Sequence, residues 1–419
     1  MRITDVLLTF VIAATGAATA CSSANPDFVC KLDADCVSAS GVQGACEVTH
    51  RCSLPDTVCP TRRRYVEYAG TLSERCTDAV LGCVTDVRAG DQVTCVRKMD
   101  GSAWCWGAGV TTPKRFGTAT DIAEIAVGGM GVCVRHETAE VECATSPSAP
   151  VTRIAGLSAV RISVGANHAC AVTSDRRVAC WGANQRGQLG DGTLQTSSVP
   201  VMVGLSGMRQ VSAGANSTCA VGDSGYVFCW GTNDFGELGA GTCQDCPVIG
   251  ELARSPVPVD FALPLADSVT VGGHFACATT PSGTVYCWGS NGQAQLIGAT
   301  GDYSEVPVQL TSLTGVTRLT TGASHACVSD ASGAVLCWGD NRFRQSTSTA
   351  ADLLKTPVPV VGADGLALRF VDISAGTQHT CGRSSDGIVQ CWGDNSRGEI
   401  GDGTLSAATQ PSAAMLTCP

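Results

Sequence analysis

The chain has 419 residues, of which 44% are hydrophobic and only 15% are charged, so it can bury a large core and is not an intrinsically disordered protein. Its 37 acidic residues outnumber its 27 lysines and arginines, and the net charge of −10 argues against nucleic-acid binding, which needs a basic surface to displace counterions. The chain also has 25 cysteines. A reducing compartment rarely holds so many outside metal clusters, so they indicate disulfides and an oxidising environment.

Residues 1–20 have the pattern of a signal peptide. Arg2 precedes a short apolar run at residues 6–14, and the small residues 18–20 (Ala-Thr-Ala) suit cleavage. The arrangement resembles a bacterial lipoprotein signal, in which the next residue, Cys21, becomes the lipid-anchored first residue. Cleavage without lipidation would use the same residues. The sequence therefore predicts an outer-membrane or cell-surface lipoprotein, or otherwise a freely secreted protein.

Residues 21–83 are predicted to form a separate cysteine-rich module that tethers the rest of the chain to its anchor. Four of its cysteines follow a Cys-x5-Cys-x9-Cys-x5-Cys pattern, which allows three connectivities. Small modules with little core use such disulfide frameworks for stability. The favoured pairs are Cys30–Cys46, Cys36–Cys52 and Cys59–Cys76, and the connectivity stays open.

From residue 95 onwards, cysteines occur in seven pairs that are each ten residues apart, and successive pairs begin 37 to 58 residues apart. Such a period is typical of a propeller or solenoid array. Each pair encloses a turn signal, so we expect a β-hairpin whose two strands are bridged. The tight Cys-x2-Cys pairs of zinc sites are missing from these hairpins. The predicted disulfides are Cys95–Cys105, Cys133–Cys143, Cys170–Cys180, Cys219–Cys229, Cys277–Cys287, Cys327–Cys337 and Cys381–Cys391.

The second cysteine of each pair begins a longer pattern. Trp-Gly follows it in six of the seven repeats, and then come a glycine-rich turn, a strand containing Pro and Val, and a strand ending in Gly. This makes four short strands per repeat, which is the content of one propeller blade.

The pattern resembles the regulator of chromosome condensation repeat family. The resemblance rests on the Gly-x-x-His step before the first cysteine (residues 165–168, 322–325 and 376–379), the Trp-Gly step, and the Gly-Gln-Leu-Gly-Asp-Gly-Thr run at residues 187–193. It covers residues 84–419 and implies an all-β, seven-bladed β-propeller. The export signal indicates a bacterial secreted or lipoprotein type. Repeats one and two lack the glycine-rich run, and repeats five and six keep it only loosely.

Two further disulfides are predicted in this region. Cys83 and Cys418 occupy the same position in the repeat frame, so we expect a Cys83–Cys418 bond that joins the first and last repeats. Cys243 and Cys246 lie in an insertion at about residues 241–258. With no helix beside them and no second Cys-x2-Cys, a local disulfide is favoured over a redox or zinc site.

Other candidate ligands have structural interpretations. His168, His325 and His379 share one repeat position, where we expect each to pack and hydrogen-bond within its own blade. Asp191 and Asp402 lie in glycine turns but have no acidic partner at the spacing that calcium needs. The sequence therefore predicts no metal site and no cofactor.

The chain has no linear catalytic motif. We therefore expect a non-catalytic, monomeric, protein-binding scaffold at the cell surface, with an unidentified protein or cell-surface macromolecule as partner. Membrane contact would be through the lipid anchor only. One alternative is a propeller lyase or hydrolase with its site at the axial channel. A second, implied by the resemblance, is guanine-nucleotide exchange, which export disfavours.

The loops after the Trp-Gly steps are longest in the later repeats, and one frame position would place them on one rim of a propeller. Apolar residues in polar loops are typical of a contact surface, although neutral loop growth would also lengthen them. The candidate partner-binding residues are Phe235, Ile249, Leu252, Tyr303, Phe343 and Leu353.

Overall fold

A computed structural model of the chain describes residues 45–46, 52–55, 63–65, 83–242, 247–260 and 262–416. The chain divides into two compact units, Met1–Gly82 with Thr417–Pro419, and Cys83–Leu416. In the first unit, β1 (Ala45–Cys46), β2 (Cys52–Pro55) and β3 (Arg63–Tyr65) form an antiparallel sheet. The described residues contain strands and no helix, so none of them belongs to a helix that could cross a membrane.

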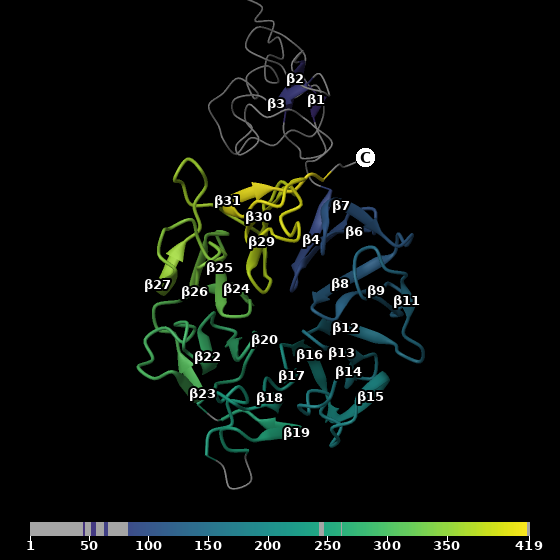
Figure 1. Cartoon of the computed structure of the whole chain (residues 1–419), viewed down its shortest axis with the longest axis vertical. Coiled ribbons are helices and arrows are strands. Elements are labelled where there is room, and N and C mark those ends of the chain that lie inside the picture. The colour runs from purple at the N-terminus through teal and green to yellow at the C-terminus, as the bar shows by residue number, and fades with distance from the viewer. Residues whose placement is uncertain are drawn as a thin grey trace, which may run out of the picture. The chain divides into compact units, whose positions relative to one another are not determined.

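The second unit is a ring of seven four-stranded blades, each built from consecutive antiparallel strands (Figure 1). Blade 1 contains β4 (Val84–Ala89), β5 (Val93–Lys98), β6 (Ala103–Gly107) and β7 (Val110–Phe116). Blade 2 contains β8 (Ile122–Gly128), β9 (Gly131–His136), β10 (Val141–Ala144) and β11 (Thr152–Arg153). Blade 3 contains β12 (Ala159–Val164), β13 (His168–Thr173), β14 (Arg177–Gly182) and β15 (Ser197–Ser206). Blade 4 contains β16 (Met208–Ala213), β17 (Ser217–Gly222), β18 (Val227–Thr232) and β19 (Leu252–Pro258).

Blade 5 contains β20 (Ser268–Val271), β21 (Phe275–Thr279), β22 (Val285–Ser290) and β23 (Tyr303–Gln309). Blade 6 contains β24 (Val316–Thr321), β25 (His325–Asp330), β26 (Val335–Asp340) and β27 (Leu353–Pro359). Blade 7 contains β28 (Asp372–Ala375), β29 (His379–Arg383), β30 (Val389–Gly393) and β31 (Ala408–Ala413). The predicted all-β, seven-bladed propeller is therefore confirmed.

The second and third strands of every blade form the hairpin that the cysteine spacing predicts. In each blade the two cysteines face each other directly across the ladder, with Cα atoms 4.0–4.1 Å apart, and they form a disulfide. The turn residue is a left-handed glycine in five blades. Ala139 and Arg176 adopt the same conformation in blades 2 and 3. The seven disulfides lie within blades, and all of their cysteines are buried except Cys143, which is half-buried.

Each of the other predicted disulfides includes at least one cysteine outside the described residues. Cys83 is disulfide-bonded, but its predicted partner Cys418 lies outside the described residues. The backbones of Cys46 and Cys52 are opposite each other in β1 and β2. The other cysteines of these predicted disulfides lie outside the described residues, and they are Cys30, Cys36, Cys59, Cys76, Cys243 and Cys246. Cys21, the predicted lipid anchor, also lies outside them.

A ring of glycines surrounds the axis where each first strand turns into the second. A Cβ atom at any of these positions would overlap the backbone of the next blade. Only glycine has no Cβ, so it is the residue that allows this approach. The seven residues are Gly90, Gly128, Gly165, Gly214, Gly272, Gly322 and Gly376.

Side chains from one inner strand cap the free backbone edge of the next inner strand. An uncapped strand edge would present unpaired N–H groups, and here short hydroxyl side chains accept hydrogen bonds from them at 2.9–3.0 Å. The donors and acceptors are Ala213 and Ser163, Val271 and Ser212, Ala375 and Thr320, and Ala89 and Ser374. The last pair joins blade 1 to blade 7, so the seam uses the same contact as three other blade boundaries.

Candidate functional site: the loop rim

Five blades have a long loop between the third and fourth strands. These loops span residues 183–196, 233–251, 291–302, 341–352 and 394–407 in blades 3 to 7. Since the strands of a blade alternate in direction, all five loops emerge at the end of the ring that carries the glycine turns. We call the loops of blades 4, 5 and 6, together with the first residue of each following strand, the loop rim.

An asparagine two residues after the Trp-Gly step organises each long loop. Its side-chain oxygen accepts a hydrogen bond from the backbone N–H five residues later, at 2.9–3.3 Å. Its amide group donates to carbonyl oxygens on the returning part of the loop. The five residues are Asn184, Asn233, Asn291, Asn341 and Asn395. Each loop is thus closed around one amide side chain, and our sequence prediction missed this role.

The tip of each long loop is the second residue after this asparagine. Its N–H donates to a Gln or Glu side chain two residues on, at 2.7–2.9 Å. The residue between them has a positive φ of 58–89° in every loop, even where Ala294 and Arg344 replace glycine. The five tips therefore share the same hydrogen bond and the same backbone turn. They are Arg186, Phe235, Gln293, Phe343 and Arg397.

The loops also join neighbouring blades. The carbonyl oxygen of the Gln or Glu accepts a hydrogen bond from the indole N–H of the next blade at 2.7–2.9 Å. The tryptophans are Trp106, Trp230, Trp288 and Trp338. The buried Nε1 atoms of Trp181 and Trp392 lack such a partner. Trp181 faces blade 2, which has no long loop, and Trp392 stacks against Phe370 with ring centroids 5.8 Å apart.

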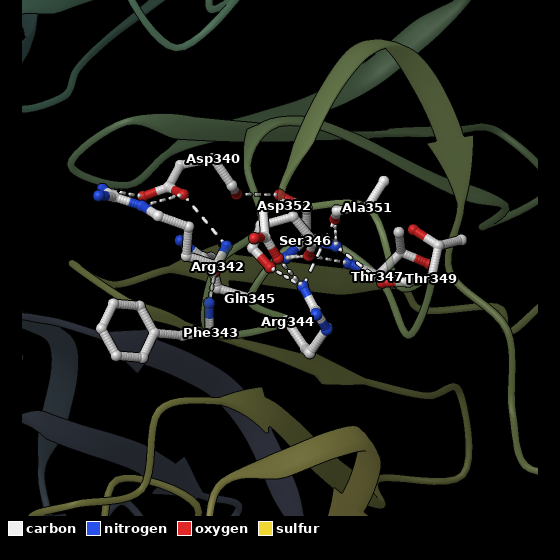
Figure 2. A network of polar contacts seen from close by, with 11 residues as sticks. Asp340, Arg342, Phe343, Arg344, Gln345, Ser346, Thr347, Thr349, Ala351 and Asp352 are labelled. Carbon is white, nitrogen blue, oxygen red and sulfur yellow. Dashed lines mark hydrogen bonds and ion pairs between the residues drawn. The ribbon is translucent and has the colours of Figure 1, made fainter.

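The blade 6 loop shows how rigidly an aromatic tip is presented (Figure 2). Arg344 donates from Nη1 to Asn341 O at 2.6 Å and to Asp352 Oδ1 at 2.8 Å. Arg342 makes a two-bond ion pair with Asp340 at 2.8 and 2.9 Å. The ring of Phe343 points away from this polar network, and 37% of the residue is exposed.

In blade 4, Glu237 holds two neighbours in place with one carboxylate. Its Oε2 accepts from Phe235 N at 2.7 Å, and its Oε1 lies 3.0 Å from His274 Nδ1. The hydrogen bond to Glu237 raises the pKa of His274, although partial burial opposes the shift. The Phe235 and His274 rings meet edge to face at 5.4 Å. Gly236 packs against the backbone of Ser304, so the Phe235 tip lies beside the start of β23.

The six predicted contact residues fall into two groups. Phe235, Tyr303 and Phe343 are 40%, 45% and 37% exposed, whereas Ile249, Leu252 and Leu353 are half-buried. Leu252, Tyr303 and Leu353 are the first residues of β19, β23 and β27, so the extra loop length ends just before them. The expected insertion at 241–258 therefore includes β19.

The repeat histidines join blades rather than acting within one, which corrects our expectation. His168 Nε2 lies 2.7 Å from Thr218 Oγ1, and His325 and His379 contact Thr380 and Thr94 at 2.9 and 2.8 Å. Each threonine hydroxyl donates to a loop carbonyl oxygen, at 2.7–3.0 Å. The histidine must then donate from Nε2, which leaves Nδ1 without a proton and, in all three residues, without a partner.

Burial lowers the pKa of these histidines, to about 4 for His168 and His325 and about 3 for His379. They are therefore neutral at pH 7. Among the described residues no group of His, Cys, Asp and Glu could hold a metal ion. Asp191 and Asp402 accept hydrogen bonds from the N–H groups of Thr193 and Thr404 and so stabilise their turns.

The axial channel has a volume of about 1260 Å³ and is lined by the inner strands of all seven blades. One end is the glycine ring. The other, where the inner strands begin, carries charged side chains, and we call it the charged mouth. Its members are Asp86, Arg88, Arg97, Glu124, Arg161, Arg209, Asp267, Arg318, Asp372 and Arg383. Burial raises the pKa of Asp86 to about 7, against the opposing effect of Arg88.

Comparisons with known proteins agree with this architecture. Human E3 ubiquitin-protein ligase HERC2 is 30% identical over 259 residues, and mouse HERC2 is 29% identical. The match covers 60% of this chain, and the chain spans about 5% of the length of these relatives. Prp20p from Saccharomyces cerevisiae, described for its binding to Gsp1p and histones, has a TM-score of 0.61 at 16% identity, covering 70% of this chain and 81% of Prp20p. Human WBSCR16 has a TM-score of 0.63 at 19% identity, covering 78% and 92%. At such identities the structures show the fold alone.

A model of the RCC1-like domain matches residues 116–417. The match begins at the last residue of β7, which agrees with the degraded pattern of the first repeat. Since it covers well over half of the sequence, the chain belongs to the RCC1-like domain family, the family that its repeats resemble.

Proposed function

We propose that this protein is a non-catalytic binding propeller that captures a protein or another cell-surface macromolecule on its loop rim. The observation that supports it best is the exposure of three aromatic side chains, Phe235, Tyr303 and Phe343, on three consecutive blades. Aromatic residues are enriched at the centres of protein interfaces. Because the loops beneath them are braced by hydrogen bonds, little entropy is lost when a partner orders them.

The same proposal places the protein outside the cytosol, anchored through Cys21 or freely secreted. Seven disulfides within the blades support an oxidising compartment. Mass measurement of the N-terminal peptide of the native protein tests the anchor. A lipid-modified Cys21 at the mature N-terminus supports it, an unmodified terminus at that point indicates free secretion, and an intact Met1 would contradict export.

Replacement of all three exposed aromatic residues of the loop rim by serine (F235S/Y303S/F343S) is expected to reduce partner capture at least tenfold. Each buried aromatic anchor contributes on the order of 2 kcal/mol in typical interfaces, so three together exceed a tenfold effect. The measurement is cross-linking and affinity capture on the native cell, followed by binding of the purified partner to wild-type and variant proteins.

A control replaces three exposed apolar residues that lie outside the loop rim (M99S/L366S/M415S), and these are 72%, 68% and 61% exposed. This control should bind the partner like the wild type. Equal capture by wild type and the rim variant, with both folded, would show that the rim is not the binding surface.

An enzyme with its site at the axial channel is the second candidate. The raised pKa of Asp86 within the charged mouth favours it, because perturbed titratable groups in clefts are common at functional sites. Capture that survives the rim substitutions but is lost in D86N would favour this candidate. Guanine-nucleotide exchange is supported only by the structural similarity to Prp20p, and the predicted export signal argues against it.

A further inference from the structure

The carboxylates of the charged mouth already have cationic partners. Arg88 Nη1 lies 2.7 Å from Asp86 Oδ1 and 3.2 Å from Asp372 Oδ2, so one guanidinium joins both acids across the boundary between blades 1 and 7. Glu124 accepts from Arg135 at 3.0 Å within blade 2. Asp267 is 3.9 Å from Arg209. Each acidic side chain of the charged mouth is therefore already paired with an arginine, and none remains to pair with the other arginines of the mouth.

Four arginines of the mouth are left without an ion pair among the described residues. They come from blades 1, 3, 6 and 7, and they are Arg97, Arg161, Arg318 and Arg383. Arg97 is opposite Asp86 in the β4–β5 ladder, and Arg383 is opposite Asp372 in the β28–β29 ladder. Both carboxylates form their ion pairs with Arg88 instead of with the arginines opposite them.

The two arginines next to these acids have buried nitrogen atoms with unmet hydrogen-bonding capacity. The Nε atoms of Arg97 and Arg383 are shielded from solvent and have no hydrogen-bond partner. Burial lowers the pKa of Arg383, and the nearby cations Arg318 and Arg88 lower it further while Asp372 and Asp86 oppose the change. A buried donor without a partner is costly, and so is a cluster of like charges.

We propose that the charged mouth binds a small multivalent oxyanion, carrying phosphate or carboxylate groups, through Arg97, Arg161, Arg318 and Arg383. Guanidinium groups match both phosphate and carboxylate with paired N–H donors. A ligand with two or more anionic groups would neutralise arginines from opposite sides of a channel that has room for it. This site is at the opposite end of the channel from the loop rim, so it is independent of partner capture.

Titration calorimetry on the full chain at low ionic strength, with pyrophosphate and citrate as separate probes, tests the proposal. We expect saturable binding of at least one probe at the charged mouth and at least a tenfold loss of affinity in R318Q/R383Q. Tighter binding of pyrophosphate identifies a phosphate ligand, and tighter binding of citrate identifies a polycarboxylate. Failure of both probes to bind the folded wild-type protein overturns the proposal.

A charge-matched control separates a site from a general effect of net charge. R176Q/R177Q removes two surface arginines of blade 3 that are paired with Asp223 and Asp175. It should keep wild-type affinity for the probe. Equal weakening in both double variants would show that the probe responds only to overall charge, which would also overturn the proposal. Thermal melts show whether each variant remains folded.

Discussion

Replacing Gly376 with alanine is expected to destabilise the propeller by about 3 kcal/mol or more, the upper end of the usual cost of overpacking a core. The new methyl group would overlap the carbonyl oxygen of Gly90 and the ring of His379. Both neighbours are held in place, because Thr377 N donates to Gly90 O at 3.0 Å and His379 contacts Thr94. The boundary between blades 7 and 1 must open to make room, and thermal denaturation measures the effect as a fall in Tm.

The matched control for this prediction is Gly204→Ala. Gly204 lies in β15, where an added Cβ would meet nothing within 4 Å and no positive φ opposes a side chain. Its Tm should change little or rise slightly, because alanine restricts the unfolded chain. Similar melting temperatures for the two variants would mean that the glycine ring is not needed for close approach of the blades.

The free energy of unfolding is expected to depend steeply on pH between about 6.5 and 4 because of the three buried histidines. Their folded pKa values, about 4, 4 and 3, lie below the ordinary value of 6.5. As the pH falls through this range, the unfolded chain binds protons that the folded state excludes, so stability is lost. Each histidine contributes up to about 1.4 kcal/mol per pH unit.

The chain itself provides a substitute for one of these histidine–threonine pairs. At the boundary between blades 5 and 6, Phe275 and Ala326 occupy the corresponding positions, and Phe275 packs on Gly272 as His168 packs on Gly165. Denaturant unfolding at several pH values should therefore show the H168F/T218A variant gaining about 3 kcal/mol relative to wild type between pH 7 and pH 4. The raised pKa of Asp86 acts in the opposite direction in both proteins and cancels from the comparison. If the free energies of unfolding of the variant and the wild type changed with pH in parallel, His168 would not be a source of the pH dependence.

The architecture could be predicted from the sequence because its strongest signals are local. Two cysteines ten residues apart with a turn between them specify one hairpin, and the Trp-Gly step and the proline-containing strand complete one blade. Trp181 and Trp392 lack the indole hydrogen bond that the other Trp-Gly tryptophans make, yet both are buried. Burial of the ring is therefore enough to fix the position of this tryptophan. Seven copies of such a unit leave few arrangements other than a closed ring.

Contacts between blades were not predictable in the same way, because they join residues about 50 positions apart. The sequence marks the glycine at the end of each inner strand but not the neighbouring carbonyl oxygen that requires it. The repeat pattern identifies His168 but not its partner Thr218. It also does not show that Arg88 forms ion pairs with the two carboxylates that lie opposite Arg97 and Arg383. In the loop rim, the apolar pattern did not separate exposed Phe235 and Phe343 from half-buried Leu252 and Leu353.

The position of the disulfides has a consequence for how the chain matures. Each of the seven described bonds joins residues ten apart within one hairpin, so a blade can acquire its covalent link as soon as its own segment has emerged. Oxidation therefore needs no long-range search among cysteines, and local closure is fast compared with distant pairing. The step that needs the complete polypeptide is the noncovalent meeting of blades 7 and 1. A shortage of oxidant should therefore delay disulfide formation in individual blades without changing the order in which the blades are arranged in the ring.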